Sequence, residues 1–97
     1  MTRVKLAASA LRDLERIREF LLTHDEQNEP ERMQEFLAGL NVLTYAPEIG
    51  RRVQPDRREL VIGRAARGYV AQYRYIRSID TVMIMAVRHQ RESSRRR

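Results

Sequence analysis

Three apolar segments of strand length lie close together in the C-terminal half of the chain, at residues 60–62, 69–76 and 81–87. Connections 63–68 and 77–80 separate them, and connections of this length join neighbouring antiparallel strands. In the second segment Tyr69, Ala71, Tyr73 and Tyr75 share one face. The third segment is apolar on both faces, which is typical of a strand covered on both sides. These segments predict a small antiparallel sheet.

Residues 8–22 have helical rather than strand periodicity. The apolar side chains recur every three or four positions. They are Leu11, Leu14, Ile17 and Leu21, widened by Ala10 and Phe20. The outer face of this helix should carry Asp13, Glu15, Arg16 and Glu19. Ser9 is a candidate N-cap. Upstream, Val4 and Leu6 alternate with cations and predict a short N-terminal strand of uncertain partner.

A second helix is predicted from Asn28, a capping residue followed by Pro30 in the first turn, to Pro47. Its apolar positions are Met33, Phe36, Leu37, Leu40 and Leu43. The polar connection between the helices is short, so the two should form an antiparallel hairpin. Residues 51–56 look like an exposed basic connection. The predicted fold class is α+β, with an N-terminal strand and a helical hairpin packed on the sheet, in the order β-α-α-β-β-β.

The charges of the chain are segregated. Residues 1–50 hold six cations and nine acids, whereas residues 51–97 hold thirteen arginines and four acids. This asymmetry favours a polyanionic or acidic partner for the C-terminal half, with a merely solvated basic face as the alternative. No cysteine is present and histidines occur only at positions 24 and 89, so neither a disulfide framework nor a metal or other cofactor is expected. No apolar run approaches the length of a membrane span and no signal peptide is apparent, so a cytoplasmic location is expected.

Several short motifs follow one another in a fixed order. After the strand and the two helices come Gly50-Arg51, Arg58-Glu59-Leu60, Gly68-Tyr69, Tyr73-Arg74-Tyr75, and the segment VRHQRE at 87–92. In this order and spacing the chain resembles the RelE/ParE superfamily of type II toxins, and its ParE branch in particular, over about residues 2–92. The resemblance implies a single toxin domain at 1–92, with a helical hairpin against a curved antiparallel sheet. Residues 93–97 would form a basic, disordered tail.

The resemblance also implies partners and two alternative activities. A cognate antitoxin, ParD-like, would wrap an acidic or amphipathic C-terminal segment around a groove of the toxin. ParE-like members are implied to inhibit or poison DNA gyrase without a hydrolytic reaction of their own. RelE-like members are implied to be endonucleases that cut messenger RNA on the ribosome. A third hypothesis is a small non-toxic module that binds nucleic acid directly.

An RNA-cleaving site needs phosphate clamps and an acid–base group. The candidates for such a catalytic set are Arg64, Arg67, Arg88, His89 and Arg91. Glu59 is a further candidate base, with an ion pair to Arg58 as the alternative. The tyrosine that commonly accompanies the histidine is absent, because Gln90 follows His89, and no lysine follows Lys5. These departures favour a gyrase inhibitor over an enzyme.

His89 therefore has three interpretations: a strand-end side chain hydrogen-bonded within the sheet or to the antitoxin, a contact to the antitoxin or the target, and a catalytic acid or base. The two glycine-flanked arginines of 63–68 could grip an anion or simply mark an exposed hairpin tip. The residues predicted to contact the target or the antitoxin are Arg58, Arg64, Arg67, Tyr69, Arg74, Arg88, His89 and Arg91.

Overall fold

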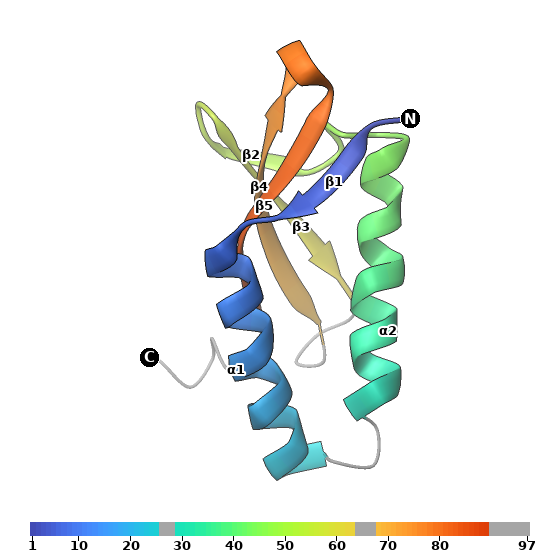
Figure 1. Ribbon diagram of the computed structural model, residues 1–97, viewed down its shortest axis with the longest axis vertical. Coiled ribbons are helices and arrows are strands. Elements are labelled where there is room, and N and C mark those ends of the chain that lie inside the picture. The colour runs from blue at the N-terminus through green and yellow to red at the C-terminus, as the bar shows by residue number, and fades with distance from the viewer. Residues whose placement is uncertain (26–28, 64–67, 90–97) are drawn as a thin grey trace.

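Two helices cover one face of a five-stranded mixed sheet (Figure 1). The computed structural model describes residues 1–25, 29–63 and 68–89. The elements in chain order are β1 (Arg3–Leu6), α1 (Ala8–Asp25), α2 (Glu29–Leu40), a 3-10 helix (Asn41–Thr44), β2 (Arg51–Gln54), β3 (Arg57–Ile62), β4 (Tyr69–Ile76), a 3-10 helix (Arg77–Ile79) and β5 (Thr81–His89). The predicted α+β class is confirmed. Within the described residues, neither helix offers an apolar stretch that could reach across a lipid bilayer.

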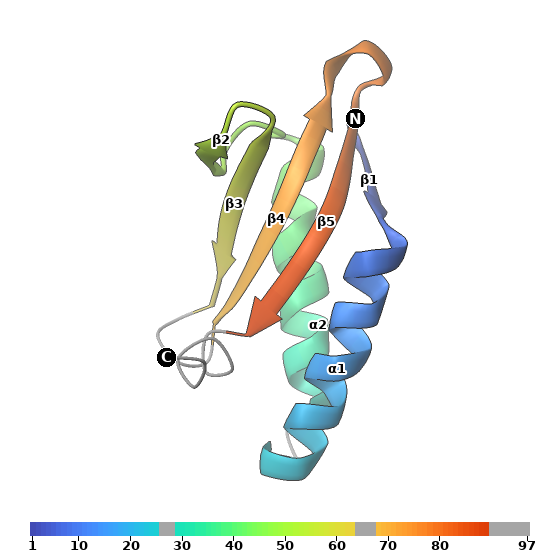
Figure 2. The same cartoon turned by 90° about the vertical axis from the view of Figure 1, so that its left-hand side faces the viewer.

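The strands lie in the order β1-β5-β4-β3-β2 (Figure 2). Strands β2 to β5 pair with antiparallel neighbours, whereas β1 adds to β5 in parallel, so the sheet is mixed. The prediction that 51–56 is only a connection was wrong, because Arg51–Gln54 forms the edge strand β2. All four of its side chains are exposed. An edge strand with no buried face shows none of the alternation that identifies a strand in sequence.

The second helix ends earlier than predicted. Regular α-helix stops at Leu40, and a 3-10 helix carries the chain to Thr44, well before Pro47. The tighter turn keeps Leu43 fully buried, and the Thr44 carbonyl accepts a hydrogen bond of 3.1 Å from the Thr2 amide. The predicted capping residue Asn28 lies outside the described residues.

The core lies between the helices and the sheet. Its fully or almost fully buried apolar side chains are Ala10, Ile17, Leu21, Phe36, Leu40, Leu43, Tyr69, Ala71, Tyr73, Val82, Ile84 and Val87. Both predicted helical stripes are largely present in it. Leu11 and Leu37 are exceptions, since 51% and 52% of their surfaces remain exposed. At Gly39 a Cβ atom would overlap the side chain of Ile62, so a glycine is what lets α2 approach β3 closely.

A β-bulge in β5 reverses the facing of its second half. Gln72 lies opposite Ala86 and Tyr73 lies opposite Ile84, which leaves Met85 without a partner on β4. Before the bulge, even-numbered residues such as Ile84 face the helices; after it, odd-numbered residues do so. The extra residue explains why 81–87 looked apolar on both faces.

The first half of β5 pairs with β1 along its outer edge, and α1 takes over where β1 ends. β1 pairs with β5 as far as Ile84, whose carbonyl accepts a bond of 2.9 Å from the Ala7 amide. Ser9 Oγ then donates to the Met85 carbonyl at 2.6 Å. The serine lies inside α1 and bridges to the bulge, so its prediction as an N-cap was wrong.

Further along α1, Asp13 Oδ2 accepts a hydrogen bond of 2.9 Å from the Val87 amide. Arg16 forms a bond of 2.8 Å with Asp13 and also reaches the Val87 carbonyl at 3.5 Å. Both side chains were predicted to lie on the outer face of the helix. That prediction was wrong for Asp13, whose side chain is only 21% exposed, and correct for Arg16, whose side chain is 47% exposed. Because α1 runs along the edge of the sheet, as Figure 2 shows, its polar flank meets backbone groups that would otherwise be unpaired.

Replacing Asp13 by alanine should lower the free energy of unfolding by about 1–3 kcal/mol, because the half-covered Val87 amide loses its acceptor. Urea denaturation of the purified protein measures this difference. Glu15→Ala is the matched control, since Glu15 is an exposed acid on the same helix. Equal stability of the two variants would contradict the proposed role of Asp13.

Candidate functional site

Glu59 lies at the centre of a polar cluster on the sheet face opposite the helices. It is directly across from Gln72 on β4 and from Arg51 on β2. Gln72 Nε2 donates to Glu59 Oε2 at 3.0 Å, and Arg51 Nη2 lies 3.5 Å from Oε1. Arg88 Nη1 reaches Oε2 from β5 at 3.6 Å. Four strands, β2 to β5, thus contribute to one cluster.

The hydrogen bond from Gln72 holds the pKa of Glu59 below its ordinary value of 4.5, and the charges of Arg88 and Arg51 act in the same direction. A carboxylate stabilised in its charged form is a weaker proton acceptor. Glu59 was predicted to be either a base or an ion-pair partner of Arg58. Glu59 does form ion pairs, but with Arg51 and Arg88. Arg58 is not its partner, because consecutive strand residues point to opposite faces of the sheet.

A shallow pocket adjoins this cluster where α1 meets the edge of β5. Its lining residues are Asp13, Arg16, Val70, Gln72, Ala86, Val87 and Arg88. The Arg88 side chain is 39% exposed and therefore accessible from solvent. A guanidinium beside an amide and a carboxylate can hold an acidic or amide side chain of a partner.

His89 lies on the other side of the sheet. It is 1% exposed and packs between Phe20 of α1 and Tyr69 of β4, with ring centroids 5.8 Å and 5.1 Å away. Tyr69 is itself buried against Phe36, at a centroid distance of 5.2 Å. The structure therefore does not bring His89 and Arg88 together, although the two are adjacent in sequence.

Arg58 stabilises the turn that leads into β2. Its Nη1 donates to the carbonyls of Glu48 and Gly50, both at 2.9 Å. The Gly50 amide donates to Tyr73 Oη at 2.9 Å, and a Cβ atom at Gly50 would lie 2.7 Å from that oxygen. Arg74 is exposed and lies 3.6 Å from Asp56 Oδ2.

The remaining predicted site residues, Arg64, Arg67 and Arg91, lie outside the described residues. Of the predicted contact residues that the structure describes, Arg74 and Arg88 are accessible, whereas Tyr69 and His89 belong to the core. Four members of the polar cluster and its pocket were not predicted from the sequence: Gln72, Arg51, Asp13 and Arg16. The alternation of β4 does place Gln72 opposite the tyrosine face, but its pairing with Glu59 depends on strand register, which a single sequence does not specify.

The chain matches the family model described as the ParE toxin of the type II toxin–antitoxin system parDE, over residues 4–94. It belongs to this family. A curated relative, Toxin RelE3 of Caulobacter vibrioides, is 34% identical over 92 residues, which is 95% of this chain and 98% of the relative. Membership of the RelE/ParE superfamily is thereby confirmed, and the chain is a type II toxin of that superfamily.

Two solved structures have similar folds. The chromosomal ParDE system from P. aeruginosa contains a chain with a TM-score of 0.76 at 18% identity, covering 92% of this chain and 96% of that one. The intact RelBE toxin–antitoxin complex of E. coli contains one with a TM-score of 0.53 at 18% identity, covering 90% and 94%. At this identity the likeness concerns the fold.

The lowered pKa of Glu59 predicts a specific loss of stability in acid. The charged carboxylate stabilises the folded state above the ordinary value of 4.5, and that contribution disappears as the pH falls through the lower folded-state pKa. Glu59→Gln cannot titrate, so its free energy of unfolding should fall less steeply than that of the unchanged protein between about pH 6 and pH 3. Urea titrations at a series of pH values measure both slopes, and parallel curves would count against the cluster.

Proposed function

We propose that this chain inhibits DNA gyrase in the bacterial cytoplasm and is neutralised by a cognate antitoxin, without cutting RNA itself. The observation that carries the proposal is the sidedness of the β5 end. Arg88 is accessible on the open face, whereas His89 is buried under α1. A phosphate clamp and a proton-transfer group must reach the same reacting atoms, and these two residues point to opposite sides of the sheet.

The remaining acid–base candidate also argues against hydrolysis. Glu59 is held charged by Gln72 and two arginines, and its low pKa weakens it as a base. Gln90 stands where RNA-cleaving relatives commonly carry a tyrosine, and no lysine follows Lys5. The accessible polar residues are better suited to contact with another protein.

An antitoxin partner is supported by surface composition. Leu11 and Leu37, one on each helix, expose half of their surfaces, and Leu22 is 39% exposed. Exposed leucines on helices suit an amphipathic segment of a partner, and the basic C-terminal half would speed its association if that segment is acidic. The structurally similar chains come from a ParDE system and a RelBE toxin–antitoxin complex.

The endonuclease remains the second candidate, since the 34% identical relative is named RelE3. A non-toxic nucleic-acid-binding module is the least supported of the three hypotheses, because the chain belongs to a toxin family.

Two reactions run side by side test the choice of target. Purified protein should inhibit supercoiling by gyrase, or trap cleaved DNA, in a dose-dependent manner. The same concentrations should leave a labelled messenger intact in a translation reaction. Ribosome-dependent cutting of the messenger with no effect on gyrase would overturn the proposal in favour of the endonuclease.

A substitution at His89 tests its role independently. His89→Phe should retain growth inhibition on induced expression, because an aromatic ring continues to fill the space between Phe20 and Tyr69. Circular dichroism and thermal melting establish that the variant is folded. A folded His89→Phe protein that no longer inhibits growth would show that the imidazole itself is required, as an endonuclease would need.

A further inference from the structure

A second pocket lies at the other end of the sheet, beside the β2–β3 turn. Six of the residues that line it are charged: Arg52, Arg57, Arg58, Arg77, Glu48 and Asp56. Pro55 and Tyr75 complete the lining. A concave site with four guanidinium groups and two carboxylates has an excess of positive charge.

The two carboxylates are already occupied by arginines. Glu48 Oε2 accepts from Arg77 Nη2 and lies 3.7 Å from Arg58 Nη2. Asp56 is paired with Arg74, which stands next to the pocket on β4. No carboxylate of the described residues forms an ion pair with Arg52 or Arg57, which leaves the pocket an excess of two positive charges.

The strand register places two arginines of the pocket opposite each other, and a bound anion would reduce the repulsion between their charges. Arg52 lies directly opposite Arg58 in the β2–β3 pair. Like charges at directly opposed positions destabilise a sheet. Arg57 Nε, in addition, is shielded from solvent and has no hydrogen-bond partner among the described residues. A bound anion would screen the repulsion between Arg52 and Arg58 and would accept a hydrogen bond from Arg57 Nε.

We propose that this pocket, formed by Arg52, Arg57, Arg58 and Arg77, binds a phosphate of the DNA backbone. Guanidinium groups suit phosphate oxygens because they offer two parallel donors. Arg77 also lies over the Tyr75 ring, 5.5 Å from its centroid, and that contact limits its orientations. The proposal deepens the proposed function: DNA is the substrate of the suggested target, so a toxin on gyrase would hold the enzyme and its DNA together.

The pocket fits a nucleic acid better than an acidic protein segment. Six of its eight lining residues are charged and Tyr75 is its one aromatic residue, whereas protein interfaces centre on clusters of apolar and aromatic anchors. The exposed leucines lie on the helices, and the exposed Ile49, Val53 and Ile79 are near lining residues in the chain but do not line the pocket themselves. Backbone phosphates require no such anchor and reward clustered arginines.

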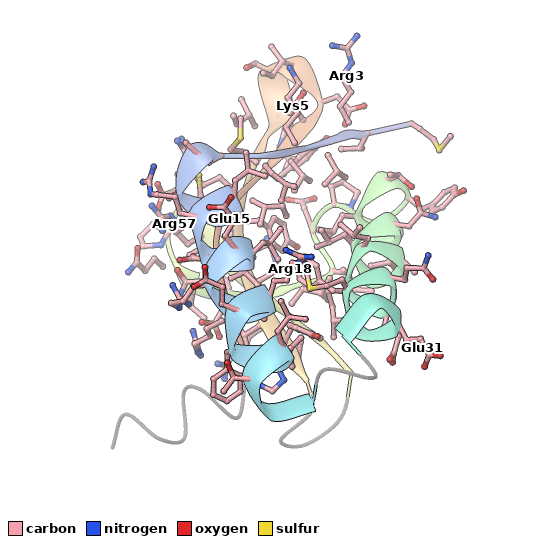
Figure 3. The ribbon with its side chains drawn as sticks, turned by 60° about the horizontal axis from the view of Figure 1, so that its bottom comes forward. Arg3, Lys5, Glu15, Arg18, Glu31 and Arg57 are labelled. Carbon is pink, nitrogen blue, oxygen red and sulfur yellow. The ribbon has the colours of Figure 1, made fainter. Side chains whose placement is uncertain are left out.

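Fluorescence anisotropy with a labelled random-sequence DNA duplex, over a series of salt concentrations, tests the proposal on the full-length protein. Each lost phosphate contact should reduce the slope of log affinity against log salt by roughly 0.9. The double substitution R52Q/R57Q removes the excess positive charge of the pocket, so it should abolish this one phosphate contact, reduce the slope by about 0.9 and weaken binding at low salt. The control K5Q/R12Q removes the same charge from exposed positions; Figure 3 shows Lys5 on a different part of the surface from Arg57. It should leave the slope close to that of the unchanged protein.

Two further measurements keep the outcomes separate. The single variant Arg52→Gln should melt at the same or a higher temperature than the unchanged protein, because a repulsive pair is lost, while its DNA affinity falls. The DNA assignment would be overturned if K5Q/R12Q reduced the slope of log affinity against log salt as much as R52Q/R57Q does. It would also be overturned if polyglutamate bound with the same salt dependence as the duplex and with the same dependence on Arg52 and Arg57. If the protein binds DNA through this pocket but does not inhibit gyrase, the proposed target is refuted while the proposed phosphate site is retained.

Discussion

The outer edge of β5 is the constraint on which the rest of the structure depends. Its first half is paired with β1, and its second half is paired with the polar flank of α1 through Ser9 and Asp13. The bulge at Met85 is the transition between these two partners. One strand edge therefore determines where the N-terminal strand ends, where α1 begins, and how the helix is aligned with the sheet.

The same bulge decides what the end of β5 presents to each side. After Met85 the facing of the strand is reversed, so Val87 and His89 enter the core and Arg88 joins Glu59 and Gln72 on the open face. A residue that the sequence makes attractive as an acid or base is thereby used for packing. The accessible arginines are left as a binding surface, which is the reading most consistent with a gyrase inhibitor.

Much of this fold follows from periodicity, and the failures have identifiable causes. The helical stripes of α1 and α2 predict their buried faces because both helices lie on a sheet. The predicted burial of Leu11 and Leu37 was wrong, because only part of each apolar stripe reaches that sheet. Strand β2 could not be predicted from the sequence, because neither of its faces is buried and its residues therefore show no apolar alternation. The bulge leaves no local signal because Ile84, Met85 and Ala86 are all apolar, and the sidedness of Arg88 and His89 could not be predicted without it.

Chemical labelling of His89 tests the central claim most directly. Diethyl pyrocarbonate modifies accessible imidazoles, and mass spectrometry of the peptide that carries His89 reports its rate of modification. A side chain with 1% of its surface exposed should be modified many times more slowly in the native protein than in urea. Equal rates in the two conditions would place His89 at the surface beside Arg88, where both residues could take part in RNA cleavage.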